Sequence, residues 1–255
     1  MIELKSPSQL ETMRAAGRIV AEVLEALRKA VRPGITTLEL DEVARGTILK
    51  GGGKPAFKGY RGFPAHICTS VNEEVVHGVP SRRKLKEGDI VGLDVGAVVD
   101  GYFADAAVTV GVGEILPEAA DLLNVTQEAL KEGIAFARVG NHLSDISHAV
   151  QKSVESHGYS VVRDFVGHGI GSELHEPPQI PNFGKPGFGP VLREGMVLAI
   201  EPMVNQGQPE VEILPDGWTA VTKDRKISAH FEHTVAVTQA GPEILTALGV
   251  ANREH

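Results

Sequence analysis

An internal repeat constrains the fold of this chain more than any single motif does. The segment LKEGDIVGLD, residues 85–94, aligns with LREGMVLAIE, residues 192–201, so that in each a turn glycine is followed six residues later by an acid. At nearly the same offset, RPGITTLELDEVA from Arg32 resembles RVGNHLSDISHAV from Arg138. Short glycine turns can recur by chance, but here the acids match as well. The repeat therefore predicts two related halves with a site where they meet.

Hydrophobic periodicity predicts the elements of each half. Ser6, Pro7 and Gln9 form a helix-start pattern, and the apolar stripe after them predicts a first helix to about Arg32. Further helices are predicted over residues 38–49, 117–138 and 144–157, and strands near Ile67 and over residues 90–98, 102–110, 197–204, 211–214 and 231–238. We expect one α+β domain spanning residues 1–255, with pseudo-twofold halves of roughly 1–112 and 113–255.

Composition excludes several classes of protein. The formal charge of −8 argues against a nucleic-acid binder that relies on phosphate neutralisation, because such proteins need a concentrated basic surface. Cys68 is the single cysteine, so no internal disulfide can form and a reducing compartment is expected. Charges throughout the first 30 residues argue against a signal peptide or a membrane span. We therefore expect a cytoplasmic protein.

Four acids lie in predicted strands. Period-two alternation places Asp94 on one face with Gly92 and Gly96, which leave room around its carboxylate. The others are Asp105, Glu201 and Glu232. Burying an unpaired carboxylate costs roughly several kcal/mol, so such a group protonates, binds a cation or stays at a solvated edge. A solvated edge is the simpler account of any one acid. For all four, two of them matched by the repeat, we favour one or two divalent cations.

Two histidines in VGHGIGSELHEPP extend this pattern. His168 lies between two glycines, which should leave its ring exposed, and His175 follows seven residues later. A lone histidine is usually an ordinary surface or core residue, and the spacing is not the helical His-Glu-x-x-His pattern of zinc proteases. Beside four acids, however, an imidazole indicates a transition metal.

The motifs together resemble a known family. DVGAVVDGYFADAA, GHGIGSELHEPP, AIEPM and FEHT, in this order, and VNEEVVHGVP before them resemble the type I methionine aminopeptidases of peptidase family M24, from the first helix to about Leu245. The resemblance implies the pita-bread fold, two related halves with a curved, mostly antiparallel sheet backed by helices. It also implies a monomeric enzyme that removes the initiator methionine from nascent polypeptides when the second residue is small.

The resemblance also assigns ligands to a dinuclear metal centre. It implies that Asp94 chelates one metal, that His168 and Glu201 are terminal ligands of the other, and that Asp105 and Glu232 bridge both. Two divalent ions, Co²⁺, Mn²⁺, Fe²⁺ or Zn²⁺, would activate the water that attacks the first peptide bond.

The resemblance gives the remaining site residues their roles. Glu201 would accept the proton of the attacking water, His175 would stabilise the developing oxyanion, and His77 would hydrogen-bond the substrate backbone. Taken alone, His77 would be read as an ordinary loop histidine. The methionine pocket would be formed by Tyr60, Phe63, Cys68 and Trp218, with Phe63 where a tyrosine is frequent in the family.

The function and one possible partner stay open at this point. A proline-directed peptidase or a creatine-type hydrolase of the same fold is one alternative, and a peptide-binding relative without catalysis is another. Lys223, Arg225 and Lys226 at an expected hairpin tip could touch ribosomal RNA near the exit tunnel, although such a tip is more often simply solvated. Neither a membrane nor a sequence-specific nucleic acid is expected as a partner.

Overall fold

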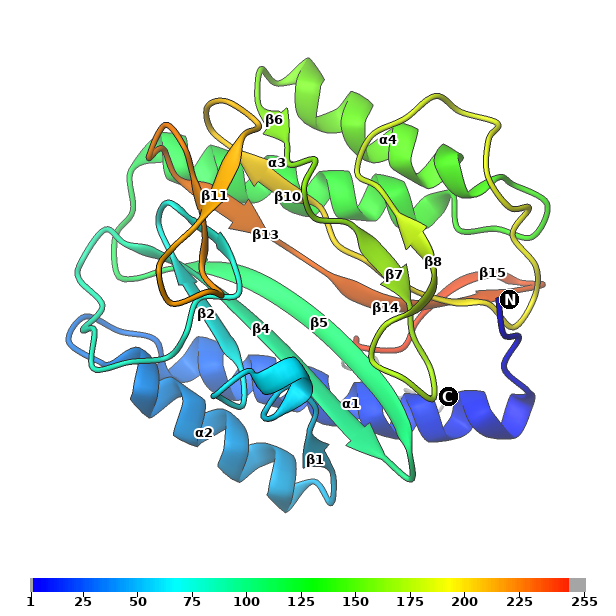
Figure 1. Ribbon diagram of the computed structural model, residues 1–255, viewed down its shortest axis with the longest axis horizontal. Coiled ribbons are helices and arrows are strands. Elements are labelled where there is room, and N and C mark those ends of the chain that lie inside the picture. Colours follow the sequence, from blue (N-terminus) through cyan, green and yellow to red (C-terminus); the bar gives the residue numbers. More distant parts are fainter. Residues whose placement is uncertain (1, 248–255) are drawn as a thin grey trace, which may run out of the picture.

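Within residues 2–247, four long helices enclose the strands. The computed structural model describes residues 2–247, so Met1 and residues 248–255 of the predicted domain lie outside the described part. Helices α1 and α2 lie on one side of the strands, and α3 and α4 lie on the other (Figure 1). The predicted helices are confirmed, with the bounds α1 Pro7–Ala30, α2 Thr37–Lys50, α3 Pro117–Ala135 and α4 Leu143–Ser156.

The first helix begins as its sequence pattern predicts. The Ser6 hydroxyl accepts a hydrogen bond from the Gln9 amide, and the Gln9 side chain accepts one from the Ser6 amide. This capping box satisfies amides that the first helical turn leaves free. Among the helices of residues 2–247, none has both the length and the apolar run that are needed to cross a bilayer.

The strands pair antiparallel throughout. Residues 2–247 form sheets with the orders β1-β4-β2 with β5 beside β4, β13-β10-β6, β11-β12-β3 and β15-β14-β9-β7-β8. A 3₁₀ turn, η1 (Tyr60–Gly62), precedes β2. The strand bounds are β1 Lys54–Pro55, β2 Cys68–Val71, β3 Glu74–Val76, β4 Ile90–Val99, β5 Tyr102–Gly111, β6 Ser160–Val161, β7 Gly167–Gly169, β8 Glu176–Ile180, β9 Val197–Ile200, β10 Met203–Asn205, β11 Val211–Ile213, β12 Ala220–Thr222, β13 Ser228–His230, β14 His233–Thr238 and β15 Gly241–Ile244.

The repeat seen in the sequence is present in the backbone. Leu85 exchanges hydrogen bonds of 2.8 Å with the turn at Gly34 and Ile35. Leu192 makes the same exchange with the turn at Gly140 and Asn141, at 3.0 and 2.8 Å. The two aligned turn glycines, Gly88 and Gly195, share a φ of +86°, which a side chain would disfavour. The fold is therefore the α+β arrangement of two related halves that the sequence predicted.

One apolar cluster crosses the junction of the halves. It joins Leu24 of α1 and Leu93 of β4 in the first half to Ile146 of α4 and Ile200 of β9 in the second. Burying a side chain of this size contributes roughly 1.5–3 kcal/mol. The two halves therefore share a core, which fixes their relative position at the site between them.

The strand predicted over residues 197–204 is interrupted, and the one predicted over residues 231–238 begins only at His233, so the sequence prediction was wrong at these two places. β9 ends at Ile200 and β10 begins at Met203, while β13 ends at His230 and β14 begins at His233. Pro202 has no amide to continue a ladder. The two breaks face each other, because His233 pairs with Ile200 and Met203 with His230. Glu201 and Glu232 therefore lie in the breaks rather than inside strands.

Candidate active site

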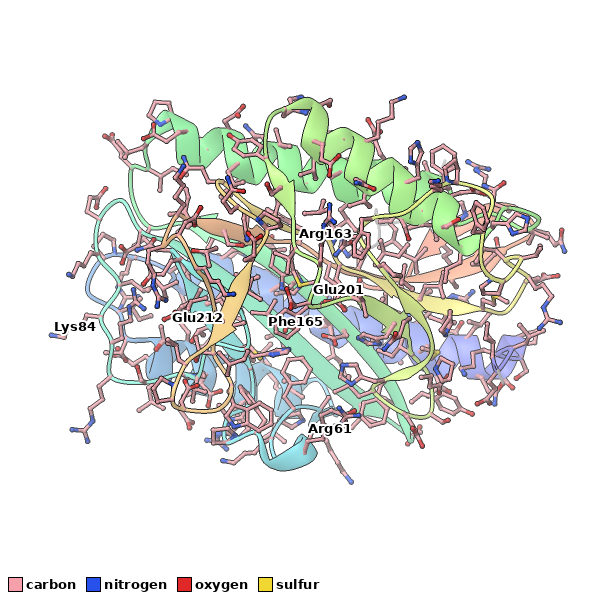
Figure 2. All side chains as sticks on the ribbon, turned by 45° about the horizontal axis from the view of Figure 1, so that its top comes forward. Arg61, Lys84, Arg163, Phe165, Glu201 and Glu212 are labelled. Carbon is pink, nitrogen blue, oxygen red and sulfur yellow. The ribbon has the colours of Figure 1, made fainter. Side chains whose placement is uncertain are left out.

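A cavity of about 170 Å³ lies where the two halves meet. All eleven residues that the sequence singled out line it, although their roles remain proposals. Figure 2 shows Glu201 in the middle of the molecule between the helix layers, with Arg61 near its edge. The lining residues from the first half are Tyr60, Phe63, Cys68, His77, Asp94 and Asp105, and those from the second are His168, His175, Glu201, Trp218 and Glu232.

Two of the acids lie on neighbouring strands of one hairpin. In β4 and β5, Asp94 pairs with Ala107 and Asp105 pairs with Gly96, so the carboxylates project from the same face at diagonal positions. The hairpin turns at Asp100 and Gly101, with φ of +46° and +82°, where the sequence predicted a turn. The turn and the register together bring both carboxylates to one place.

Backbone contacts between the halves align these acids with Glu232. Glu232 and Ala107 exchange backbone hydrogen bonds of 2.9 and 3.4 Å. The Thr234 hydroxyl donates to the carbonyl of Asp105 at 2.7 Å and accepts from its amide at 2.9 Å. Asp105 and Glu232 are therefore held beside each other although they come from different halves.

His168 completes the cluster. One ligand atom each from Asp105, His168 and Glu232 lie within 4.8 Å of one another, and His168 Nε2 lies 3.5 Å from Glu201 Oε1. His168 Nδ1 lies 2.9 Å from the Gly169 carbonyl, so Nδ1 donates and Nε2 keeps its lone pair. Burial lowers the pKa of His168 to about 4, which keeps the ring neutral.

The glycines beside His168 do not expose its ring, as the sequence had suggested, but allow close packing of strands. The imidazole is buried, with 6% of the residue exposed, so the expectation of an exposed ring was wrong. A Cβ on Gly167 would lie 2.4 Å from the Ala199 carbonyl oxygen, and one on Gly169 would lie 2.3 Å from that of Pro177. Both glycines therefore allow neighbouring strands to approach β7 closely.

The electrostatics of the cluster fit a divalent cation. Burial raises the pKa of Asp94 to about 7. Burial, together with repulsion from neighbouring carboxylates, raises the pKa values of Asp105, Glu201 and Glu232 well above their ordinary values. Within the described residues, Asp94 Oδ1, Asp105 Oδ1 and Glu232 Oε1 are buried without a hydrogen-bond partner. A mixed set of carboxylate oxygens and one imidazole nitrogen suits a divalent transition metal.

His175 faces the cluster from the loop before β8. Its ring centroid lies 4.1 Å from that of His168, and its Nδ1 lies 2.8 Å from the Tyr60 hydroxyl. In the tautomer in which Tyr60 donates this bond, Nε2 has the remaining ring proton. Desolvation, with a smaller effect of His168, lowers the pKa of His175, so the ring is a neutral donor near pH 7.

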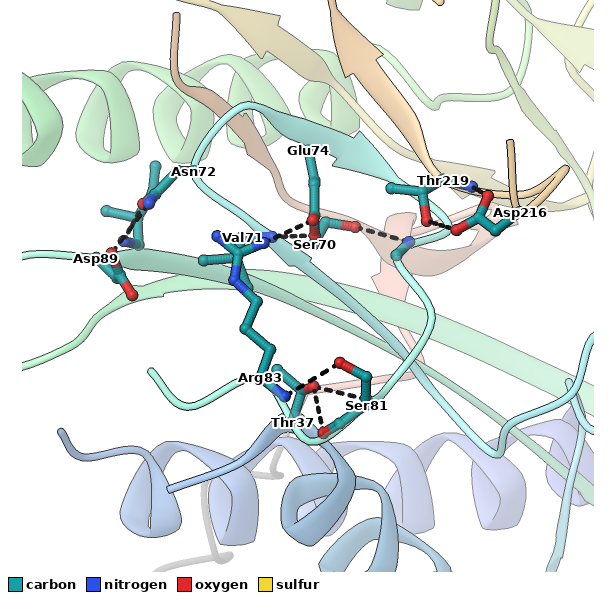
Figure 3. A network of polar contacts seen from close by, with 12 residues as sticks. Thr37, Ser70, Val71, Asn72, Glu74, Ser81, Arg83, Asp89, Asp216 and Thr219 are labelled. Atoms are coloured by element: carbon teal, nitrogen blue, oxygen red, sulfur yellow. Dashed lines mark hydrogen bonds and ion pairs between the residues drawn. The ribbon is translucent and has the colours of Figure 1, made fainter. Parts of the chain in front are cut away.

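His77 lies in a strained turn after β3. Its φ is +60°, and its ring packs edge-on against Phe165 with centroids 5.3 Å apart. The following amide, of Gly78, donates to the Ser70 hydroxyl at 3.2 Å. Figure 3 shows this bond within a polar network around Glu74, which accepts from the Val71 amide. The network fixes the turn that points His77 toward the cavity.

The predicted methionine pocket is an apolar corner of the cavity. Phe63 and Trp218 pack edge to face with centroids 5.2 Å apart, and the buried Cys68 lies opposite Asp94 in the ladder. Asp216 holds the turn at Trp218, because its carboxylate accepts from the Trp218 amide and from the Thr219 amide and hydroxyl (Figure 3). This corner combines aromatic edges with a sulfur atom, as a site for a thioether side chain would.

Several residues of the site were missed by the sequence interpretation. Phe57, Arg61 and Leu174 also line the cavity. His230 is buried, its Nε2 lies 3.7 Å from Glu201 Oε2, and that nitrogen has no other partner within residues 2–247. The signal for His230 was its place two residues before Glu232. Phe57 and Arg61 are close in sequence to the predicted pocket residues, and Leu174 directly precedes His175.

The fold and the site define a class of protein. The chain belongs to metallopeptidase family M24, because the model of that family matches residues 11–239. Within this class it is 55% identical to the methionine aminopeptidase of Clostridium perfringens, over 97% of this chain and 100% of that protein. A crystal structure of methionine aminopeptidase from Thermotoga maritima superposes with a TM-score of 0.96 at 52% identity, covering 97% of this chain and all of that one.

More distant structures share the fold alone. A prolidase from Pyrococcus furiosus is 24% identical, with a TM-score of 0.78. The superposition covers 96% of this chain but only 66% of the prolidase. The pita-bread fold is thus common to peptidases with different names, and the identity of this chain rests on the closer relatives.

Proposed function

We propose that this protein is a methionine aminopeptidase, which hydrolyses the first peptide bond of polypeptides whose N-terminal methionine precedes a small residue. The observation that supports this most strongly is the 55% identity to a protein of that name over its whole length. The geometry agrees with it, because every predicted site residue lines the same cavity.

Five side chains would hold the metal centre. Asp94, Asp105 and Glu232 offer the unpaired buried oxygens, and His168 Nε2 and Glu201 lie beside them. We propose that they bind two divalent ions, with Asp105 and Glu232 shared between the ions. Candidate ions are Co²⁺, Mn²⁺, Fe²⁺ and Zn²⁺, which this donor set accepts without selecting among them. When bound, such ions supply Lewis acidity that polarises a peptide carbonyl and lowers the pKa of water.

The protein's own groups would move the protons and orient the peptide. Glu201, whose pKa burial raises, would accept a proton during attack and pass it on to the leaving amine. The Nε2 proton of His175 would be donated to the oxyanion that develops on the carbonyl. His77, which also lines the cavity, would hydrogen-bond the substrate backbone. The methionine side chain would occupy the corner formed by Phe63, Cys68, Trp218 and Tyr60.

Cellular properties follow from this activity. An enzyme acting on nascent chains would work in the cytoplasm, and we propose that it does so as a monomer. Lys223, Arg225 and Lys226 lie in an exposed turn between β12 and β13, where Arg225 pairs with Glu212. They are the candidate contact with the ribosome near its exit tunnel, which pelleting of an alanine triple variant with ribosomes would test.

Peptide turnover tests the proposed activity. Purified protein supplied with Mn²⁺ or Co²⁺ should release methionine from Met-Ala-Ser and leave Met-Lys-Ser intact, as measured by chromatography of the products. If Met-Ala-Ser binds but is not hydrolysed with each of the four ions tested in turn, the proposal is contradicted and a non-catalytic peptide-binding protein is favoured. Cleavage of Ala-Pro peptides in preference to Met-Ala-Ser would instead favour a proline-directed peptidase.

A further inference from the structure

A buried ion pair joins the segment before α1 to the loop that contains His175. Lys5 Nζ lies 2.6 Å from Glu176 Oε2, and the exposed fractions of the two side chains are 1% and 10%. A second acid, Glu3, lies 3.4 Å from the same nitrogen but is half exposed. The two members of the main pair are 171 positions apart in the sequence. Glu176 lies inside the GHGIGSELHEPP motif but was given no role there, Lys5 lies in no motif, and neither residue lines the cavity.

The surrounding backbone is shaped to admit the lysine. The Lys5 amide donates to the Gly195 carbonyl at 2.7 Å, which anchors the segment before it reaches the loop. A Cβ on Gly171 would lie 2.0 Å from Lys5 Cε and 2.5 Å from Nζ. A side chain at position 171 would therefore displace the end of Lys5 from its place beside Glu176. Since a buried ammonium without a partner is costly, the pairing with Glu176 is a requirement of the fold here.

Glu176 also organises the loop itself. Its Oε1 accepts from the Glu173 amide and from the Ser172 hydroxyl, both at 3.2 Å. The Gly171 carbonyl accepts from the Phe103 amide at 2.8 Å, which fixes the start of the loop to β5. One carboxylate thus binds Lys5 with one oxygen and closes residues 171–176 with the other. His175 is the residue directly before it, and its ring reaches His168 and Tyr60.

We propose that the Lys5–Glu176 ion pair is a positioning device for His175, so that the segment before α1 contributes to turnover. The inference rests on the proposed function, in which His175 donates to the oxyanion. Loss of Lys5 would leave the carboxylate of Glu176 without its cation in a buried place, and the 171–176 loop would shift. A displacement of about 1 Å at a catalytic group can cost roughly 100-fold in rate. Neither residue of the pair touches the substrate.

Kinetics of Lys5→Met test the proposal. We expect kcat for Met-Ala-Ser to fall roughly 10- to 100-fold, while KM changes less than about threefold and the bound metal is unchanged, because the ligands do not depend on this loop. Arg14→Gln is the matched control, since it removes the more exposed ion pair of Arg14 with Glu243, also near the N-terminus. It should leave kcat unchanged. A Lys5→Met variant with the wild-type kcat would overturn the proposal.

A double variant separates positioning from general destabilisation. If the pair acts through His175, adding Lys5→Met to His175→Ala should lower kcat no further. An equal fall in both backgrounds would show that Lys5 acts by another route. If Lys5→Met fails to fold, Glu176→Gln offers a smaller change, since the amide keeps an acceptor oxygen. It should lower kcat in the same direction, and an unchanged kcat would again contradict the proposal.

Hydrogen exchange gives a reading that does not depend on peptide turnover. In Lys5→Met the amides of residues 171–176 should exchange faster than in the wild type, while those of β4 and β5 keep their protection. Unchanged exchange in this loop would overturn the positioning role even if the variant were slow. Absence of turnover by the wild type would count against the proposed function, and the exchange experiment would still decide whether the pair orders the loop.

Discussion

At the scale of single residues, Asp105 is buried and fixed at the junction of the two halves. It is buried, its backbone is bonded to Thr234 of the other half, and one of its oxygens lacks a partner within residues 2–247. An unpaired buried oxygen of this kind costs roughly 1–3 kcal/mol. A bound cation would offset that cost, whereas a solvated edge cannot account for a residue that is 5% exposed.

Asp105→Ala should therefore remove metal and activity together. A ligand shared by two ions serves both, so we expect both ions to be lost at micromolar metal and turnover to fall at least about 100-fold. Metal content by elemental analysis and release of methionine are measured on the same sample. Glu22→Gln, on the exposed face of α1, is the control. Near-normal turnover by Asp105→Ala would refute the dinuclear centre.

His175→Ala should lower turnover without removing the metal. The imidazole is adjacent to His168, but in its proposed role it donates a proton to the substrate and is no metal ligand, so turnover should fall roughly 100- to 1000-fold with the metal content intact. Tyr60→Phe removes only the hydroxyl that fixes the tautomer, and a smaller loss of kcat is expected. Loss of metal from His175→Ala would show that this histidine is a ligand, contrary to its proposed role.

At the scale of elements, the sequence predicted regular structure better than its interruptions. The four helices and the β4–β5 hairpin follow from periodicity, caps and turn residues, which are local properties. The breaks after Ile200 and His230 were missed because apolar residues continue on both sides of them. Pro202 was the local signal for one break, and only pairing between the halves determines the other.

Some residues of the site could be predicted from local sequence and others could not. The gathering of the four acids in one cavity could be predicted, because acids within apolar strands are conspicuous and the repeat relates Asp94 to Glu201. The Lys5–Glu176 pair could not be predicted, since nothing near Glu176 in its motif indicates that its partner is Lys5. Contacts over 171 positions depend on the assembled fold, and no pattern within either segment indicates them.

Another long-range contact, from α2, shapes the pocket that we propose for methionine. Asp41 is buried, and its Oδ1 accepts from the amides of His66 and Ile67 while its Oδ2 lies 2.7 Å from His66 Nδ1. These bonds hold the segment between Phe63 and Cys68. The helix thus reaches the pocket through one carboxylate.

Asp41→Ala should weaken both the fold and the binding of methionine. It leaves two buried amides without an acceptor, so we expect the free energy of unfolding to fall by about 2–4 kcal/mol and KM for Met-Ala-Ser to rise. Denaturant titration and steady-state kinetics measure the two effects. Glu42→Ala, the exposed neighbour on the same helix, should change stability by less than about 0.5 kcal/mol. An unchanged KM in a folded Asp41→Ala protein would show that the Asp41 contact of α2 does not affect the binding of methionine.

At the scale of the whole molecule, the site couples the two halves electrostatically. Asp94 and Asp105 come from the first half, and His168, Glu201 and Glu232 come from the second. Without cations, burial raises the pKa of all four acids, and neighbouring carboxylates raise those of Asp105, Glu201 and Glu232 further, so ionising the cluster at the junction is unfavourable. A metal centre would therefore stabilise the assembled halves as well as supply the chemistry.

The stabilisation by metal should depend on pH with a definite sign. In the metal-free protein, burial raises the pKa of Asp94 from 3.8 to about 7, and the pKa values of Asp105, Glu201 and Glu232 also rise. Above pH 4 the folded metal-free state thus binds more protons than the unfolded state. Its stability is present at low pH and is lost as the pH rises through about 7. Cations compete with these protons, so their binding tightens over the same range.

Thermal unfolding at pH 6, 7 and 8, with EDTA or with excess Mn²⁺, measures this coupling. The Tm of the EDTA-treated protein should fall from pH 6 to pH 8, and the increase in Tm produced by Mn²⁺ should grow. Asp105→Ala should show a much smaller increase at every pH, because it lacks the shared ligand. A metal-induced increase in Tm that is constant across the three pH values, or largest at pH 6, would mean that the four carboxyls do not hold protons in the metal-free fold. The cluster would then need another source of compensation for its charge.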